Sequence, residues 1–596
     1  MTVPAANGST DLRARARLAF VAAAYGDALG WPNESRGKLA LKKSKSDPSP
    51  DFVSWTRRDG YRATLHTEII EPGTYSDDTQ LMVAIARSLI TSGDDGWWRR
   101  LTRVELPFWR LYQRGGGGAT LRAAKAWAEG KSPWQAGFKE YVEAGGNGVA
   151  MRILPHVIWH HGDGYARVHR NIILDGLATH GHPRALMGAA LFGYVLWSLF
   201  GRSDSLDFGQ MVQTALQGIE EWSASPEVHT STVKEWAPST WIPASGYKDG
   251  WAATRLETIE LLHIVGKAME EGALFVDRTT LERLGALGPQ RGSGTISAVS
   301  AIFLASRYAA DPTHGVLEAA FAMGADTDTL ACMTATLLST VREGSQLAYR
   351  AQKVQDRDFL GNIGSTLANK GTLVPAAVAK SDVITASIAS DWLGELVRRK
   401  KYDAVRLLDG RSGKIIGHAT RHERDVEITE VKVEASDGQT LRFKHSEKHR
   451  VVRPNTMFPD LPTESPVEST RSYRNETPPH AFAVEVVLRC RDLETTVRFY
   501  EGAFNLRIHD DRRHRAPAVN AQVRFEGHLT FLQARNEAEV KAQAGAEIRL
   551  RTRQTTALAE QIARAGAQVK IEERDGISVL TAKDPDGRTV TVFTVR

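Results

Sequence analysis

The segment GADTDTLACMTATLLS, residues 324–339, joins an acidic, hydroxyl-rich start to a run that is apolar on all sides of a helix. A helix that is apolar all round is buried inside a large domain. Few stretches before about residue 375 alternate with period two, so we predict an all-α domain over residues 1–375. Further runs of helical period, separated by Gly-, Pro- and Asp-rich breaks, cover residues 17–29, 78–90, 171–179, 184–200, 296–309 and 329–341.

Two clusters of acidic and hydroxyl residues stand at predicted helix starts. One is DTDT, residues 326–329, and the other is SDDT, residues 76–79. Such residues cap free N–H groups and suit the helix dipole, and this interpretation stays open for each cluster. Each cluster nevertheless holds more acids than capping needs. If the two converge, four carboxylates repel one another unless hard divalent cations, Mg²⁺ or Mn²⁺, neutralise them.

Three further segments are ambiguous when each is taken alone. GDALGWPNE, residues 26–34, is a helix end followed by a loop with an acid. GGNGVAMR, residues 145–152, is a glycine-rich turn whose N–H groups can approach a phosphate. THGHPRA, residues 179–185, carries two histidines between two helices. Singly, each is explained as a loop acid, turn glycines or capped histidines.

Together and in this order, these five motifs resemble the ADP-ribosylglycohydrolase family over roughly residues 15–355. The resemblance implies an orthogonal helical domain that holds two Mg²⁺ or Mn²⁺ ions and removes ADP-ribose from a macromolecular acceptor, either a protein or a nucleic acid. The glycine run RGGGGAT, residues 114–120, also resembles the family but is weak evidence.

The resemblance also implies a role for individual residues. The metal ligands would be Ser76, Asp77, Asp78, Asp326, Asp328 and Thr329. The substrate-binding residues would be Gly146, Asn147, Gly148, Met151, Arg152 and His180. Glu34, Asp77 and Asp78 are the candidates for orienting or deprotonating the attacking water, and the sequence does not choose among them. Two departures are visible, Ser76 in place of Thr and Ala325 in place of Gly, and neither removes a ligand.

The composition of the sequence changes near residue 381. Short alternating segments separated by Asp-Gly turns predict a small antiparallel β module over residues 381–454, after a short helix at 391–401. The module carries basic residues, which could form a polyanion-binding face, but interleaved acids favour a solvated strand surface; they are Arg421, His422, Arg424, Arg442, Lys444, Lys448, His449 and Arg450. Residues 455–480 are Pro-rich and aperiodic, as a linker is. A second basic run, residues 36–45, would lie either on a cleft rim or in a solvated loop.

Residues 481–596 resemble the glyoxalase and bleomycin-resistance group of vicinal-oxygen-chelate folds, with βαβββ units and helices predicted at 493–504 and 555–565. At the metal-ligand positions of that group this chain has Glu485, Gln533, Glu547 and Thr591. Because two acids without a histidine make a degenerate site, we predict a binding or dimerising module without metal chemistry. Such folds often pair two-fold, which favours a homodimer.

The overall composition excludes some classes of protein. The formal net charge of +6 over 596 residues is too small to argue for nucleic-acid or membrane binding. Two distant cysteines, Cys332 and Cys490, exclude a disulfide scaffold and a zinc finger and fit a reducing compartment. No run approaches the roughly 18–20 apolar residues of a membrane span, so we expect a cytoplasmic protein without a membrane partner.

Three functions follow as hypotheses. The first is the metal-dependent ADP-ribosylglycohydrolase, in which the C-terminal modules recruit the substrate or a second subunit. The second is a non-catalytic reader that binds ADP-ribose or a related nucleotide and signals through those modules; the complete ligand set argues against it. The third is a vicinal-oxygen-chelate enzyme or resistance protein with a regulatory helical domain, which the thin ligand set of residues 481–596 argues against.

Overall fold

The computed structural model describes residues 8–34, 49–60, 64–202, 206–226, 244–272, 276–370, 383–423 and 426–448, and beyond them the strands between residues 485 and 594. The chain divides into two compact units, Met1–Thr456 and Met457–Arg596, and each is described by itself. Several predicted features lie outside the described residues: the basic run 36–45, the residues Arg424, His449 and Arg450, the linker 455–480, and nearly all of the helices at 493–504 and 555–565.

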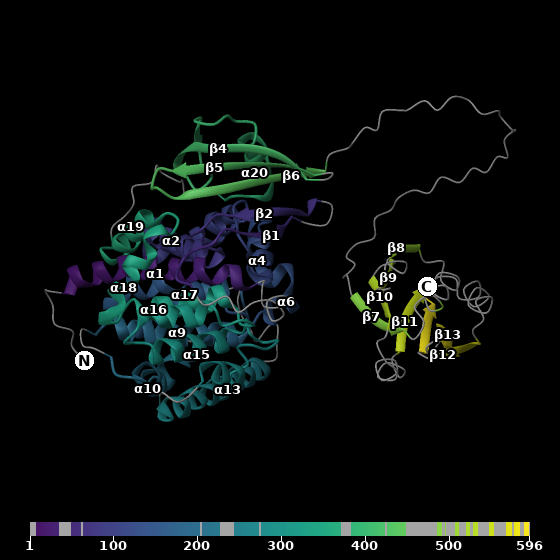
Figure 1. Ribbon diagram of the computed structural model, residues 1–596, viewed down its shortest axis with the longest axis horizontal. Helices are drawn as coiled ribbons and strands as arrows, with labels where there is room; N and C mark the ends of the chain where they lie inside the picture. Colours follow the sequence, from purple (N-terminus) through teal and green to yellow (C-terminus); the bar gives the residue numbers. More distant parts are fainter. Residues whose placement is uncertain are drawn as a thin grey trace. The chain divides into compact units, whose positions relative to one another are not determined.

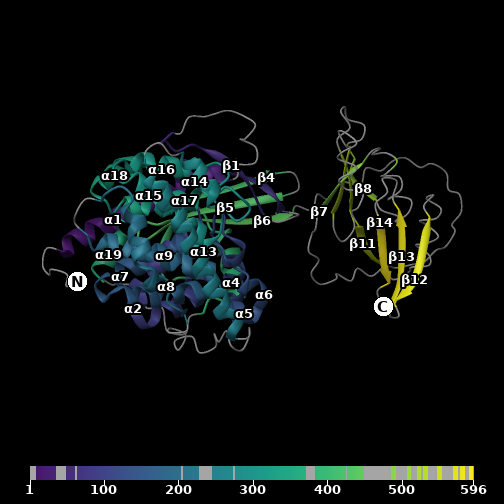
Figure 2. The same ribbon diagram turned by 90° about the horizontal axis from the view of Figure 1, so that it is seen from below.

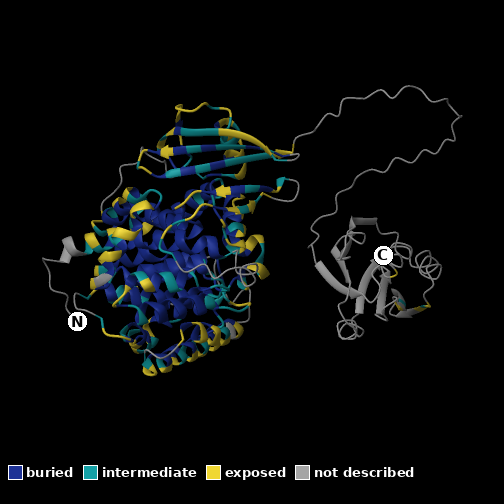
Figure 3. Ribbon diagram, viewed as in Figure 1, coloured by how far each residue is buried: buried dark blue, intermediate teal, exposed yellow. Residues whose placement is uncertain are grey.

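The first unit is mainly helical, as predicted. Its longer helices are α1 (Gly8–Glu34), α2 (Asp77–Arg100), α4 (Gly118–Ala128), α8 (Tyr165–Leu177), α9 (Pro183–Phe200), α10 (Gln210–Gln217), α13 (Ala244–Glu270), α15 (Gly294–Arg307), α16 (Pro312–Ala320), α17 (Thr327–Leu338), α19 (Arg357–Ala368) and α20 (Ala386–Leu396). Its shorter helices are α3 (Leu106–Trp109), α5 (Pro133–Ala136), α6 (Phe138–Val142), α7 (Leu154–Trp159), α11 (Ile219–Trp222), α14 (Asp277–Arg283) and α18 (Ser345–Arg350). Figure 1 shows α1 crossing this helical body, whose interior is buried in Figure 3.

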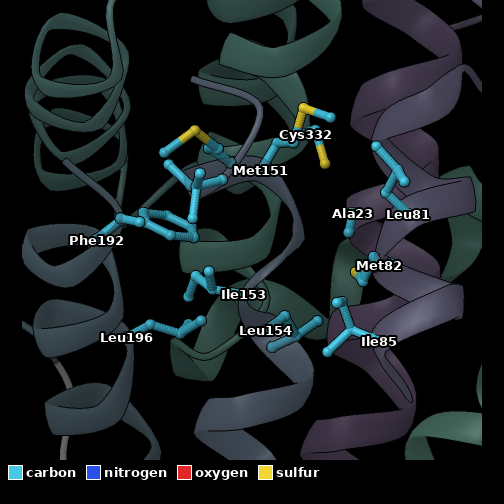
Figure 4. Close-up of a cluster of buried hydrophobic side chains, with 14 of the residues drawn as sticks. Ala23, Leu81, Met82, Ile85, Met151, Ile153, Leu154, Phe192, Leu196 and Cys332 are labelled. Carbon is cyan, nitrogen blue, oxygen red and sulfur yellow. The ribbon is translucent and has the colours of Figure 1, made fainter. Parts of the chain in front are cut away.

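The core lies where α1, α2, α9 and α17 approach one another. Figure 4 shows part of it, with Ala23 of α1, Leu81 of α2, Phe192 of α9 and Cys332 of α17 all buried. Among the described helices α9 is long and apolar enough to span a membrane, and 78% of that stretch is buried inside the structure. It packs against α8 and α15, as a core helix of a large domain does.

Two glycines set the distance between α1 and α17. A Cβ on Gly26 would lie 2.2 Å from the carbonyl oxygen of Ala331, and one on Gly30 would lie 2.1 Å from that of Thr327. Because the glycines are four residues apart on α1, they lie on one face of that helix. The two backbones can therefore touch, and Thr327 donates a hydrogen bond of 2.9 Å from its hydroxyl to the Gly30 carbonyl.

One feature of residues 1–375 differs from the all-α prediction. Strands β1 (Trp55–Asp59) and β2 (His66–Ile70) form an antiparallel hairpin. Burial does alternate along β2, but two of its three buried residues, His66 and Glu68, are polar. A search for alternating apolar residues misses such a strand, because the buried face is stabilised by charges rather than by apolar side chains.

The predicted β module is a four-stranded sheet of order β3-β4-β5-β6, with β3 at Ala404–Arg406, β4 at Ser412–Glu423, β5 at Val426–Ala435 and β6 at Thr440–Lys448. Neighbouring strands are antiparallel. The sheet packs on the helical body beside the β1–β2 hairpin (Figures 1 and 2), and Phe443 of β6 contacts the rings of Phe108, Tyr112 and Trp392. Charged residues join this interface, since Arg442 and Lys444 both pair with Glu68 of β2.

The second unit contains two sheets of the same topology. The first has the order β7-β10-β9-β8, with strands Glu485–Cys490, His528–Gln533, Asn520–Arg524 and Arg507–Asp511. The second has the order β11-β14-β13-β12, with strands Glu547–Thr552, Thr589–Thr594, Ile577–Lys583 and Val569–Arg574. Strand β7 is parallel to β10 and strand β11 is parallel to β14, and all other neighbouring strands of the two sheets are antiparallel. This is the strand pattern of two βαβββ units, and it confirms the predicted fold class.

A carboxylate-lined pocket as the candidate functional site

A polar pocket of about 200 Å³ lies where the starts of α2 and α17 approach the end of α1. It is large enough for several water molecules or hydrated ions. Of the residues predicted for the site, only Ser76 and Arg152 do not line it. The lining consists of Glu34, Asp77, Asp78, Gly115, Gly117, Gly118, Ala119, Thr120, Gly146, Asn147, Gly148, Met151, His180, Asp326, Asp328 and Thr329.

The start of α2 is capped by residues that are not the pocket carboxylates. The Ser76 hydroxyl accepts a hydrogen bond of 3.2 Å from the backbone N–H of Asp78. The carboxylate of Asp27, on α1, accepts hydrogen bonds from the backbone N–H groups of Ser76 and Thr79 at 2.8 and 3.0 Å. Asp77 and Asp78 are therefore not required as caps, and their side chains line the pocket.

At the start of α17, too, the carboxylate that lines the pocket does not cap the helix. Asp326 occupies the N-cap position, but its side chain makes no capping hydrogen bond. It instead accepts a hydrogen bond of 2.9 Å from the side-chain amide of Asn147, which comes from the glycine-rich turn. Asp326 is therefore not a helix cap, and its carboxylate is oriented by a hydrogen bond from the glycine-rich turn.

Burial and neighbouring carboxylates raise the pKa values of four carboxyl groups of the pocket, those of Glu34, Asp77, Asp78 and Asp328. Burial, followed by the charge of Asp27, raises the pKa of Asp77 to about 8. Burial, followed by the charge of Asp326, raises the pKa of Glu34 to about 7. Burial and neighbouring carboxylates also raise the pKa values of Asp78 and Asp328. A site that raises several carboxyl pKa values together favours the binding of a cation.

The donor atoms of the pocket suit a hard divalent cation, because they are carboxylate and hydroxyl oxygens. One of them, Oδ2 of Asp78, is buried and has no hydrogen-bond partner among the described residues. In this arrangement, however, no group of three His, Cys, Asp or Glu side chains in the described part of the chain could by itself hold a metal ion. The pocket therefore has the right donors for Mg²⁺ or Mn²⁺ without being a preformed cage.

The glycine-rich turn is fixed by the loop before α15. Its backbone pairs with that loop through Asn147 N–H to Gly292 O at 2.8 Å and Gly294 N–H to Gly145 O at 3.0 Å. The ring of His180 lies close to the turn, 3.2 Å from where a Cβ on Gly148 would be. A side chain at that position would contact the imidazole, so glycine keeps this face of the pocket open.

His180 is neutral at physiological pH. Burial, followed by the charge of Arg152, lowers the pKa of His180 to about 3. Its Nδ1 lies 2.7 Å from the hydroxyl of Thr179, which orients the ring. An uncharged imidazole on the pocket wall can therefore donate or accept a hydrogen bond without adding a charge.

Arg152 does not lie where its motif implied. Its side chain is fully buried behind the pocket, and its guanidinium donates to the Asp175 carboxylate at 2.9 and 3.1 Å and to the Thr179 hydroxyl at 2.9 Å. A guanidinium so paired supports the segment that carries His180 rather than contacting a ligand in the pocket. Arg152 thus lies outside the pocket lining, and its role in substrate binding stays a prediction.

Two parts of the site carried too weak a signal in the sequence. Asp27 belongs to the GDALG motif, but only the fold shows that its carboxylate organises the start of α2. The glycine run contributes Gly115, Gly117 and Gly118 to the pocket wall. The substitution of Ala325 for glycine is tolerated because the neighbouring Gly324 has the positive φ, 103°, while Ala325 is not among the residues with positive φ.

Comparisons with known proteins agree with this division of the chain. The model of the ADP-ribosylglycohydrolase family matches residues 8–374, and that of the glyoxalase-like domain matches residues 485–593. No curated protein matches the chain.

Solved structures are similar to each part separately. An "ADP-ribosylglycohydrolase-related protein complex" is 18% identical, with a TM-score of 0.40, and the alignment covers 61% of this chain and 100% of that one. A glyoxalase / bleomycin resistance protein from Catenulispora Acidiphila is 14% identical, with a TM-score of 0.17, over 19% of this chain and 98% of that one. A lactoylglutathione lyase from Agrobacterium tumefaciens is 18% identical, with a TM-score of 0.17, over 20% and 95%.

Proposed function

Because residues 8–374 make this chain a member of the ADP-ribosylglycohydrolase family, we propose that it hydrolyses the C1″ glycosidic bond between ADP-ribose and a macromolecular acceptor. The products are free ADP-ribose and the unmodified acceptor, a protein or a nucleic acid. The observation that carries the proposal is the convergence of five carboxylates and the glycine-rich turn on one pocket.

The pocket residues supply the parts that such a hydrolysis needs. The bond breaks through an oxocarbenium-like state, and water attacks the anomeric carbon. Glu34 and Asp77, with pKa values raised to about 7 and about 8, lie in the range where a carboxylate serves as a general base near neutral pH. Asp78 is the third candidate for orienting this water. The glycine-rich turn and the neutral ring of His180 form the wall against which the nucleotide would bind.

We propose that two Mg²⁺ or Mn²⁺ ions bind to oxygen donors at the starts of α2 and α17. Bound there, they would lower the pKa of a ligated water and polarise the ribose diol. Asp326 contributes a carboxylate that Asn147 already orients, and Asp78 contributes an oxygen that has no other hydrogen-bond partner in the described structure. The proposed ligands that line the pocket are Asp77, Asp78, Asp326, Asp328 and Thr329; Ser76, which the resemblance also implied, lies outside the lining and caps α2.

One observation favours a second candidate, a reader that binds ADP-ribose without cleaving it. The glycine-rich turn and the uncharged ring of His180 line the pocket and could hold the nucleotide whether or not metal ions bind. A protein that kept the nucleotide pocket but could not assemble its metals would bind ADP-ribose and signal through its C-terminal modules.

We further propose that the glyoxalase-like domain recruits the acceptor or a second copy of the chain. It matches its family model over residues 485–593. Glu485 begins β7, which is parallel to β10, and its register partner is His528. Glu547 begins β11, which is parallel to β14. The oligomeric state, measured by light scattering on the full chain and on residues 1–456, tests this part.

The function is tested by ADP-ribose release from Arg-linked, Ser-linked and nucleic-acid-linked substrates, with Mg²⁺, with Mn²⁺ and with a chelator. Metal-dependent release from one substrate class would establish the hydrolase and identify its linkage. Tight ADP-ribose binding without release from any substrate would favour the reader instead.

A further inference from the structure

The β1–β2 hairpin brings Arg57 beside Gly115 of the pocket wall, although Arg57 is not itself part of the lining. The guanidinium carbon of Arg57, on β1, lies 5.2 Å from the ring centre of Trp31, which is on α1 close to Glu34. Trp55 packs edge-on against the same indole, with ring centres 5.1 Å apart. The arginine side chain is thus held over an aromatic surface at the end of α1, and only 14% of it is exposed.

Gly115 connects Arg57 to the pocket. A Cβ on Gly115, a residue of the pocket wall, would lie 3.5 Å from Oδ1 of Asp77 and 3.6 Å from Nη1 of Arg57. Arg57 and the pocket carboxylate of Asp77 are therefore both neighbours of Gly115. Burial and the charge of Asp326 raise the pKa of the Glu34 carboxyl, and the charges of Arg291 and, less strongly, Arg57 oppose this shift.

The orientation of Arg57 is set from the β module. Its Nε donates a hydrogen bond of 2.7 Å to Oε2 of Glu68, on β2, and the Glu68 side chain is only 2% exposed. The other oxygen of that carboxylate, Oε1, lies 2.7 Å from the ammonium of Lys444, on β6. A buried carboxylate bound on both sides is a rigid link, so Lys444 acts on Arg57 through Glu68.

The guanidinium retains an unused donor. Nη1 of Arg57, the nitrogen nearest Gly115, makes no hydrogen bond with a described residue, whereas Nη2 is buried, with Oδ1 of Asp59 3.8 Å away. Buried donors are normally satisfied, and a guanidinium matches the geometry of a phosphate. Since the pocket itself is lined by carboxylates, a cation beside it would favour the approach of an anionic ligand.

We propose that Arg57 binds a phosphate of ADP-ribose at the edge of the pocket and that Lys444 positions it there through Glu68. The inference deepens the proposed function, because ADP-ribose is the ligand in both. It means that the β module, and not the helical domain alone, contributes to substrate binding.

Arg57→Gln in the full chain tests the binding role by calorimetry with ADP-ribose and with adenosine, which has no phosphate. Loss of a charge-assisted hydrogen bond should weaken ADP-ribose binding roughly tenfold to hundredfold. Adenosine affinity should stay unchanged, and Arg57→Lys, which keeps the charge, should recover part of the loss. Equal losses for both ligands would reveal a merely structural arginine, and unchanged ADP-ribose affinity would also overturn the proposal.

Lys444→Met tests the link, and Lys432→Met is its matched control. Lys432, on β5, makes a more exposed ion pair with Glu71 at 2.6 Å, and no contact among the described residues joins it to Arg57. Lys444→Met should weaken ADP-ribose binding by about threefold to tenfold, and add little to Arg57→Gln in the double variant. An equal effect of Lys432→Met, or fully independent effects of Lys444 and Arg57, would contradict the link.

The outcome separates the inference from the proposed function. If the wild-type chain binds ADP-ribose through Arg57 but releases none from any substrate, the hydrolase fails and the phosphate site stands. If the wild-type chain is active and Arg57→Gln binds ADP-ribose normally, the phosphate site fails and the hydrolase stands.

Discussion

The carboxylate of Asp27 accepts a hydrogen bond of 2.6 Å from the hydroxyl of Thr79, and so ties the middle of α1 to the first turn of α2. The same carboxylate receives two backbone N–H groups of that turn. All of these groups are buried. The turn that presents Asp77 and Asp78 to the pocket is thus held by a residue that does not line the pocket.

Asp27→Ala should therefore destabilise the protein and lower its activity. Two backbone N–H groups and a hydroxyl would lose their acceptor in a buried place, and we expect a loss of about 2–4 kcal/mol in the free energy of unfolding. Urea denaturation measures this. Asp27→Asn keeps the volume but offers only one acceptor oxygen, so it should fall between the alanine variant and wild type. Wild-type stability in Asp27→Ala would contradict the capping role.

Asp326→Asn distinguishes a metal ligand from a helix cap. We expect it to abolish ADP-ribose release and to lower the amount of Mn²⁺ retained after dialysis. Its metal-free stability should remain within about 0.5 kcal/mol of wild type, because the Asp326 side chain caps nothing.

Asp311→Asn is the matched control for that experiment. Asp311 occupies the N-cap of α16, where its side chain accepts a hydrogen bond from the N–H of His314, away from the pocket lining. This variant should keep full activity. Full activity and metal retention in Asp326→Asn would remove that residue from the site.

Gly30→Ala should separate α1 from α17. The new Cβ would meet the Thr327 carbonyl at 2.1 Å, a backbone atom that cannot rotate away. Overpacking of this kind costs about 1–3 kcal/mol or more, and it would also displace the start of α17. Gly266→Ala, in α13, has no atom within 4 Å of the new Cβ and should leave stability unchanged or raise it by up to about 1 kcal/mol. Thermal denaturation and ADP-ribose release compare the two variants. An equally stable, active Gly30→Ala would show that the helices can separate without cost.

Divalent cations should stabilise the protein more at alkaline than at acidic pH. The pKa values of Glu34 and Asp77, about 7 and about 8, are raised above those of an unfolded chain. Such groups stabilise the folded state at low pH, and this contribution is lost as the pH rises through their folded pKa values. Metal binding requires their ionised forms, so Mg²⁺ should raise Tm more at about pH 8.5 than at about pH 6. A Tm increase that is independent of pH would place the ion elsewhere.

The helices and their buried faces could be predicted from the sequence alone. The predicted helix at 329–341 corresponds to α17, Thr327–Leu338, and the one at 184–200 to α9, Pro183–Phe200. Apolar periodicity is a local property of the chain, so it survives folding. The β1–β2 hairpin was missed because Glu68 faces inward against Lys444 and Arg57, and a pairing between residues so distant in the chain leaves no local period.

What the sequence by itself determined is the set of chemical groups: carboxylates and hydroxyls at two helix starts, a glycine-rich turn, and a histidine between two helices. Capping and metal binding use the same residue types at the same positions, so no local pattern separates them. Only the tertiary structure decided that Ser76 and Asp27 cap α2 while Asp326 faces the pocket, and that Arg152 lies behind it. The physical reason is that three of these placements depend on a partner from another segment: the first turn of α2 for Asp27, Asn147 for Asp326, and Asp175 for Arg152.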